Sequence, residues 1–172
     1  MSELQGFSAA SVQELEMLLR QIGTGKLAIV GVGNPLRADD FAGSLVVKQL
    51  ARRLSGRRNQ TLLLDAEIAP ENLTDKIRAF APETVIFIDS AVMGYPPGTI
   101  KLVDLQETEY PYFSTHNLPL RLLSSLMGDS PHAFLLGIEP RRTDFGEKMS
   151  REVKLACESV VDVVHRTVGV VS

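Results

Sequence analysis

Hydrophobic positions along the chain alternate between two patterns, one typical of helices and one typical of buried strands. Helical patterns, as in the three- and four-residue spacing of Val12, Leu15 and Leu19, predict helices over 9–22, 41–54, 72–80, 118–127 and 149–168. Short, nearly continuous apolar runs predict strands buried on both faces over 26–32, 61–64, 84–88, 99–105 and 133–137. The alternation predicts an α/β fold, a three-layer sandwich with a five-stranded, mostly parallel twisted sheet between helices on both faces.

One connection between predicted strands departs from this alternation. Residues 89–99 include Pro96, Pro97 and Gly98 but show no helical pattern. A parallel crossover needs a longer path, so we expect the strand over 99–105 to run antiparallel at an edge of the sheet. No repeat or linker divides the chain. We therefore expect one α/β domain over 26–172, preceded by a helical extension over 1–25.

Composition narrows the classes of protein that fit the 172-residue chain. Eighteen basic and 21 acidic residues give a net charge of −3, which argues against nucleic acid as a partner. The apolar runs are too short to cross a membrane. The single cysteine, Cys157, lies on an apolar helix face and cannot form an internal disulfide. We expect a cytoplasmic protein in which Cys157 is a core residue.

Acidic residues follow two strands that we expect to be neighbours. Asp40 comes after the first strand and Asp89 after the third, and these strands lie side by side in the common flavodoxin-like order. His116 arrives from a later polar loop, whereas His132 and His165 fit structural positions. Two carboxylates and an imidazole suit a borderline divalent transition ion, and three ligands leave positions free for a substrate. Taken singly, each acid has a simpler role as a helix cap or turn residue. Taken together, they predict a metal site in a solvent-reachable pocket at one edge of the sheet.

The glycines of the first loop suggest a nucleotide site as a second possibility. Gly31 and Gly33 match part of a dinucleotide-binding fingerprint, with Asp65 placed to bind a ribose. Leu36 stands where the fingerprint needs a third glycine for close helix packing. The adjacent acids 39 and 40 would also repel a phosphate at the helix N-terminus. These features disfavour a nucleotide.

The chain resembles the hydrogenase maturation endopeptidases through an ordered series of motifs. Residues 31–43 match the opening motif of that family, G-x-G-N-x-L-x-x-D-[DE]-x-x-G. Further matches are Asp65, 69–72 (Ala-Pro-Glu-Asn), 88–94, 97–100, 114–120 and 136–140. The Thr-His-Asn-x-Pro-Leu and Gly-Ile-Glu-Pro segments are most similar to the branch that serves formate-hydrogenlyase-type hydrogenases. The resemblance covers residues 27 to about 168.

Those enzymes remove the C-terminal extension from the large subunit of [NiFe] hydrogenases after nickel has been inserted. The resemblance implies this substrate, and it implies a five-stranded sheet between helices as the fold. By position in the motifs, it implies that Asp40, Asp89 and His116 meet the metal, the same trio that the strand order selects. The nickel is expected to come with the precursor and to mark it as ready, so the purified protein is expected to be empty.

We therefore expect an endopeptidase with nickel used for substrate recognition and the trio as its catalytic centre. Asp39 and Asp65 are the next candidates for support or proton transfer. Gly31, Gly33 and Asn34 are expected to shape the loop and to offer backbone donors to the substrate peptide. The alternative is a non-enzymatic nickel metallochaperone, or an escort of the immature large subunit, that uses the same trio. We expect a monomer, because a protease that inspects a large folded substrate needs an open face.

Two departures from the family pattern affect these expectations. Relatives commonly have two glycines after the second-strand aspartate, whereas Ala66 and Glu67 stand here. The change could narrow the cleft or add a carboxylate to it. The helix before Lys26 is also extra, and no function is assigned to it.

Overall fold

The computed structural model describes residues 2–54, 60–107, 114–115 and 131–168 of the chain. Its α-helices are α1 (Ser2–Ile22), α2 (Ala42–Arg53), α3 (Thr74–Phe80) and α5 (Arg151–Val168). Two short 3-10 helices precede α2 and α3: η1 (Ala38–Phe41) and η2 (Pro70–Leu73). The strands are β1 (Leu27–Val32), β2 (Thr61–Glu67), β3 (Thr84–Val92), β4 (Ile100–Asp104), β5 (Ser114–Thr115) and β6 (His132–Ile138). The predicted helix over 118–127 lies outside the described residues.

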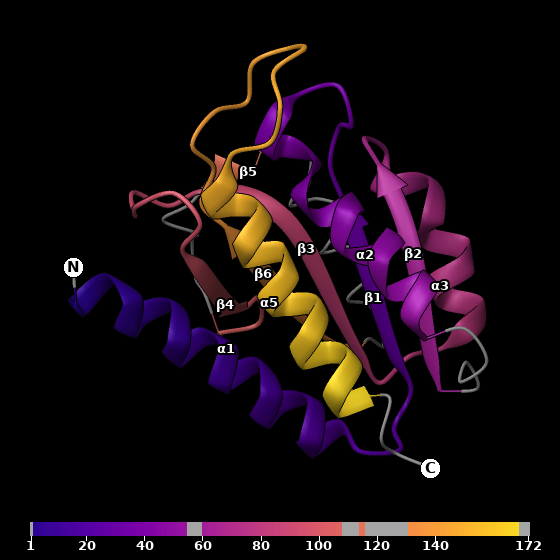
Figure 1. Cartoon of the computed structure of the whole chain (residues 1–172). Coiled ribbons are helices and arrows are strands. Elements are labelled where there is room, and N and C mark those ends of the chain that lie inside the picture. The colour runs from indigo at the N-terminus through magenta and orange to yellow at the C-terminus, as the bar shows by residue number, and fades with distance from the viewer. Residues whose placement is uncertain (1, 55–59, 108–113, 116–130, 169–172) are drawn as a thin grey trace.

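The main sheet has five strands in the order β2-β1-β3-β6-β4, as Figure 1 shows. Strands β2, β1, β3 and β6 pair in parallel, and β4 pairs antiparallel with β6 at the edge, with Ile100 opposite Ile138. This confirms both the mostly parallel sheet and the antiparallel edge strand. The two-residue strand β5 pairs with the end of β3, outside the main order.

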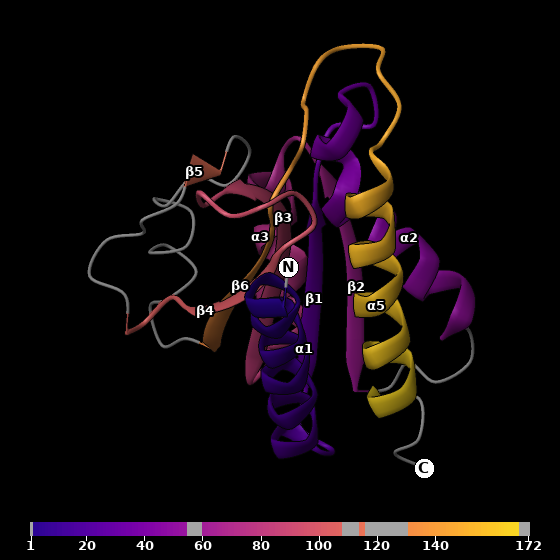
Figure 2. The same ribbon diagram turned by 60° about the vertical axis from the view of Figure 1, so that its left-hand side comes forward.

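Helices cover both faces of the sheet, as predicted. Helices α2 and α5 lie on one face and α3 on the other (Figure 2). Alternate strand residues point to opposite faces, so each face has its own hydrophobic cluster. Ile86 and Ile88 pack in the cluster shared with α1, α2 and α5, and Phe87 packs in the cluster that includes Ile77 of α3. This alternation decides which polar residues at the strand ends can meet.

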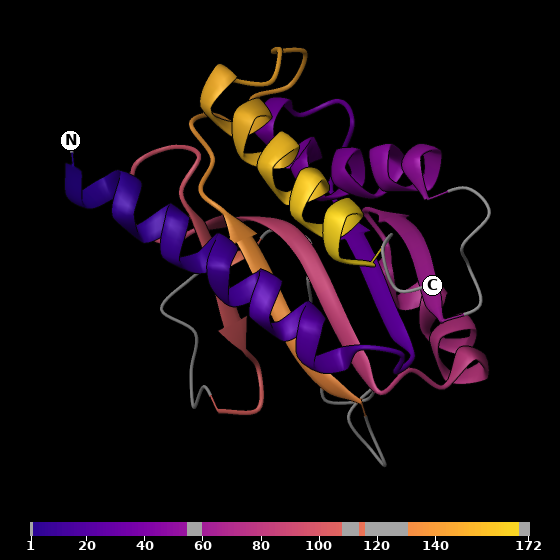
Figure 3. The same cartoon turned by 60° about the horizontal axis from the view of Figure 1, so that its bottom comes forward.

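Helix α1 belongs to the same core as the rest of the chain. It begins at Ser2 rather than at the predicted residue 9, so Ser11 lies inside the helix and is buried. Leu15 and Leu19 are buried in the α1–α2–α5 cluster, and α1 contacts α5 and β4. Figure 3 shows α1 and α5 crossing the same face of the sheet. The helical extension therefore covers the β4 end of that face.

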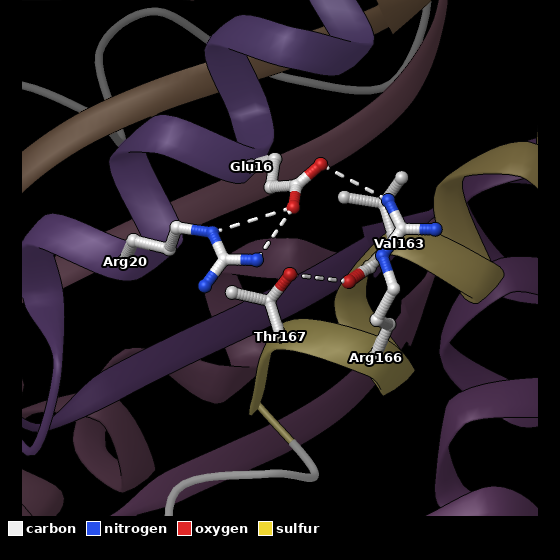
Figure 4. Close-up of polar contacts among 5 residues, drawn as sticks. All are labelled: Glu16, Arg20, Val163, Arg166 and Thr167. Atoms are coloured by element: carbon white, nitrogen blue, oxygen red, sulfur yellow. Dashed lines mark hydrogen bonds and ion pairs between the residues drawn. The ribbon is translucent and has the colours of Figure 1, made fainter.

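A group of charged side chains joins α1 to the last turn of α5 (Figure 4). Glu16 accepts hydrogen bonds from Arg20, at 2.8 Å, and from Arg166, at 3.0 Å. These bonds lower the pKa of the Glu16 carboxyl from its ordinary value of 4.5.

Among the described helices, none combines the length and the apolar character that crossing a membrane requires.

Candidate active site

The loop after β1 is held against the sheet by glycines that allow close backbone contact. A methyl group at Gly31 would overlap the carbonyl oxygen of Gly43, and one at Gly43 would overlap the carbonyl oxygens of Val32 and Ile88. The first turn of α2 therefore rests on the carboxyl ends of β1 and β3. Gly43, which closes the family motif, supplies the close helix packing that the sequence analysis sought at Leu36.

Asp40 and Asp89 lie at the carboxyl ends of neighbouring strands. Asp40 is in η1, which follows β1 and contacts β3, and Asp89 is in β3. Asp40 Oδ2 accepts a hydrogen bond from Asn34 N at 3.3 Å. The two residues are only 3% and 0% exposed, respectively. The two carboxylates are therefore buried in this structure, and not in the solvent-reachable pocket predicted from the sequence.

His116 lies outside the described residues, so the third member of the predicted trio has no assigned position. The residue before it, Thr115, pairs with Ala91, and Ser114 pairs with Val92. Strand β5, which ends one residue before His116, therefore lies beside the end of β3. Its Thr115 pairs with Ala91, two residues beyond Asp89. Within the described ranges, no three His, Cys, Asp or Glu residues form a group that could hold a metal ion.

Asp39 is engaged in a different part of the fold from Asp40, although the two are adjacent in sequence. Its side chain accepts hydrogen bonds from Arg141 N at 2.8 Å, Arg142 N at 3.1 Å and Ser150 N at 2.6 Å. Ser150 Oγ donates a fourth bond at 2.9 Å, and Asp39 is completely buried. Asp39 therefore fixes the long β6–α5 loop to η1. Neither acid caps α2, whose N-cap residue is Phe41 and has no side-chain cap bond.

The structure places Asp65 and Asp89 on opposite faces of the sheet. Asp65 faces α2, where Ser44 Oγ donates to its Oδ1 at 2.6 Å and Lys48 Nζ lies 3.4 Å from its Oδ2. Asp89 shares the opposite face with Phe87, because residues two apart in a strand point the same way. The predicted strands ended before these two acids, whereas β2 and β3 include them, and the sheet separates their side chains.

The predicted substrate-binding residues of the β1 loop use their backbone donors within the fold. Gly33 N donates to Glu67 O at 2.7 Å, and Asn34 N donates to Asp40. Asn34 Oδ1 accepts a bond from Leu36 N at 2.9 Å, a side-chain turn that closes the loop. The Gly33 and Asn34 donors are thus already paired inside the protein, and Gly31 lies in β1 rather than in the loop.

Glu139 has a structural role that the sequence analysis did not assign. It is buried, and its Oε2 accepts hydrogen bonds from Met93 N at 2.7 Å and from Tyr95 N at 3.3 Å. These bonds fix the segment that leaves β3 just after Asp89. The Gly-Ile-Glu-Pro motif includes Glu139, but the motif alone does not predict these hydrogen bonds. They form because β3 and β6 are neighbours in the sheet.

Cys157 is a core residue, as predicted. Burial, with Asp39 and Glu158 nearby, raises the pKa of its thiol to about 12. Its Sγ lies 3.7 Å from the carbonyl oxygen of Ala42. A buried thiol with this pKa is not a nucleophile at neutral pH.

Comparison with known proteins places the chain in one family. A sequence model described as "Hydrogenase maturation protease" (HycI) matches residues 44–167. The hydrogenase 3 maturation protease of Escherichia coli is 34% identical over 131 residues, covering 75% of this chain and 82% of that protein. A Methanocaldococcus jannaschii relative, named for the same family, is 33% identical over 157 residues and covers 87% and 92%, respectively.

A solved structure shows the same fold. The [NiFe] hydrogenase maturation protease HycI from Thermococcus kodakarensis superposes with a TM-score of 0.78 at 29% identity. The match covers 89% of this chain and 99% of that one. The chain therefore belongs to the hydrogenase maturation protease family and is a hydrolase with that family's mostly parallel, five-stranded fold.

Proposed function

We propose that this protease removes the C-terminal extension of a [NiFe] hydrogenase large-subunit precursor after nickel has been inserted. Asp40, Asp89 and His116 would meet the precursor's nickel, so that the metal belongs to the substrate and reports its readiness. The observation that carries the proposal is the placement of Asp40 and Asp89 at the ends of adjacent strands. The register of β5, which leads into His116 from beside Ala91, supports the third ligand.

The donor set fits nickel chemically. Carboxylate oxygens and an imidazole nitrogen suit a borderline divalent ion, and low exposure strengthens the attraction between carboxylates and a cation. Because Asp40 and Asp89 are buried, the proposal includes an opening of this edge of the sheet when the precursor docks. Asn34 N, Gly33 and Gly43 hold the loop that carries Asp40 in place.

Holding the precursor by its metal centre would favour cleavage in a simple way. The attached tail stays near the site, so attack on its peptide bond becomes effectively intramolecular. A nickel ion held there would supply Lewis acidity to a nearby carbonyl or water. Alternatively, one carboxylate of the trio acts as the general base and the metal serves recognition alone.

Variants at the trio test this assignment. We expect Asp89→Asn and His116→Ala to lower the rate of precursor cleavage at least about a hundredfold, because general acid–base groups typically contribute this much. The nickel-loaded precursor should therefore keep its full length. His132→Ala is the matched control, because His132 lies at the amino end of β6 and pairs with Asp104. The readout is the intact mass of the precursor, with circular dichroism to confirm folding. Full activity in the double variant contradicts the assigned site.

Incubation of the protein with nickel-loaded precursor, and of the nickel-loaded protein with nickel-free precursor, separates the protease from a metallochaperone. Loss of a C-terminal peptide from the precursor supports the protease. Transfer of nickel to a nickel-free precursor without any change in its chain length supports the metallochaperone.

A further inference from the structure

Exposed hydrophobic side chains gather at the carboxyl end of the sheet. Among the described residues from Ser11 onward, seven large hydrophobic side chains are exposed, and five of them lie at the ends of strands or in the connections that follow: Leu36, Ile68, Val92, Tyr95 and Phe145. The other two, Met17 and Leu155, lie on helices α1 and α5. The exposed hydrophobic side chains are thus concentrated at the edge that carries Asp40, and exposed apolar patches of this kind mark interaction surfaces.

The two most exposed of these five side chains lie on loops that are bonded together. Leu36 is 61% exposed and Phe145 is 68% exposed. Gly146 N donates to Leu36 O at 3.0 Å, and the Arg37 guanidinium lies 5.6 Å from the centre of the Phe145 ring. We call residues 34–37 and 141–149 the tip. Figures 1 and 2 show the two loops side by side at one end of the molecule.

The tip is held in one conformation by internal bonds. Arg37 Nε donates to Thr143 O at 3.1 Å, and Asp39 N donates to Arg142 O at 3.1 Å. The four hydrogen bonds to the Asp39 carboxylate fix both ends of the β6–α5 loop. A surface ordered before binding loses little conformational entropy when a partner arrives.

The charge of the tip indicates the chemistry of its partner. It holds four basic residues and two acidic ones, and one of the basic residues, Arg141, pairs with Glu152 of α5 at 3.0 Å. The tip therefore keeps a net positive charge, whereas the whole chain has a net charge of −3. Arg37 and Arg142 donate to backbone carbonyls, which leaves their charge uncompensated by a carboxylate at these contacts. Two copies of a positively charged tip repel each other, so the charge favours a different, acidic partner.

We propose that the tip docks an apolar, acid-bordered surface of the precursor's folded body, while the tail reaches the site beside it. This inference rests on the proposed function, because the tip is continuous with the loop that leads to Asp40. Leu36 and Phe145 supply the apolar contact, and Arg37 and Arg142 supply the charge. Recognition then depends on a surface outside the trio of Asp40, Asp89 and His116.

Steady-state processing of the nickel-loaded precursor tests the tip. We expect Phe145→Ser to raise KM about tenfold and the Leu36→Ser/Phe145→Ser double variant to raise it further, as truncation of central interface side chains does. The kcat at saturating precursor and the melting temperature stay unchanged, and KM of the wild type rises with added salt. Met17→Ser and Leu155→Ser are the matched controls and leave KM unchanged.

The outcomes separate this inference from the proposed function. If the double variant keeps the wild-type KM while Asp89→Asn is inactive, the tip inference is wrong and the proposed function stands. If the wild type binds the precursor through the tip but never shortens it, the proposed function is wrong and the docking surface stands. A dimer of the wild type that dissociates in the double variant, with KM unchanged, assigns the tip to self-association and overturns the inference.

Discussion

At the scale of single residues, three non-glycine residues in the described part of the chain adopt left-handed backbone conformations. Ala38, Glu67 and Ala81 have φ angles of 44°, 49° and 52°. This conformation costs an L-residue roughly 1–2 kcal/mol relative to its usual regions, and glycine avoids the cost. Glu67 occupies one of the two positions at which relatives commonly have glycine, so its conformation gives a backbone reason for that glycine.

Ala81 offers a direct measurement of this backbone cost. It is the exposed C-cap residue of α3, and its amide donates to Ile77 O at 3.0 Å. We expect Ala81→Gly to stabilise the protein by about 1 kcal/mol, because glycine is the preferred residue at a left-handed helix end. The readout is the midpoint of urea unfolding.

The matched control is the same substitution two residues earlier. Ala79 is exposed within α3, where glycine costs up to about 1 kcal/mol relative to alanine. Ala79→Gly should therefore lower the midpoint that Ala81→Gly raises. A shift of the same sign in both variants contradicts the assigned conformation of Ala81.

The adjacent acids Asp39 and Asp40 show why sequence alone could not assign the site residues. Both belong to one motif and look equivalent, yet the Asp39 carboxylate accepts four hydrogen bonds from the connection between β6 and α5. Those donors lie more than 100 residues away in the chain. Asp65 and Asp89 both lie near the carboxyl ends of strands, and only strand alternation in the assembled sheet shows that they face opposite ways. Long-range contacts, rather than residue type, separate these roles.

At the scale of elements, the polar join between α1 and α5 should depend on pH. Hydrogen bonds from Arg20 and Arg166 lower the pKa of Glu16, so its ionised form is favoured in the folded protein. A carboxyl group with a lowered pKa stabilises the fold above its ordinary pKa, 4.5, and loses this contribution as pH falls through the lowered value. We expect Glu16→Gln to lower the melting temperature slightly near pH 7 and to have no effect at the acid end.

A second variant on the same helix controls for the change in charge. Glu14 is exposed on α1, and Glu14→Gln removes one negative charge as Glu16→Gln does. Its melting temperature should follow the wild type at every pH. A Glu16→Gln deficit that persists below the lowered pKa would show that packing, and not the ion pairs, accounts for the loss.

The elements themselves were largely predictable from the sequence. Pro96, Pro97 and Gly98, with no helical pattern around them, correctly placed β4 antiparallel at the edge. The start of α1 was not predictable, because residues 2–8 carry few apolar positions and gain their place by continuing a helix anchored at Leu15 and Leu19. The packing role of Gly43 also escaped detection, since it depends on the approach of α2 to the ends of β1 and β3.

At the scale of the whole molecule, the described features gather at one end of the sheet. The sheet brings Asp40 and Asp89 to neighbouring strand ends, and Glu139 fixes the segment that follows β3. Asp39 fixes the tip next to η1. One end of the sheet therefore holds the residues proposed to bind the precursor's nickel. The tip, which is proposed to dock the precursor, lies next to them.

The central claim is that the precursor's own nickel governs cleavage. We expect the purified protein, incubated with a nickel-loaded precursor, to release one C-terminal peptide that intact-mass spectrometry detects. The same precursor prepared without nickel should keep its full mass over the same time. Equal cleavage of the two precursors would contradict the account, because cleavage would then not depend on nickel bound by Asp40, Asp89 and His116.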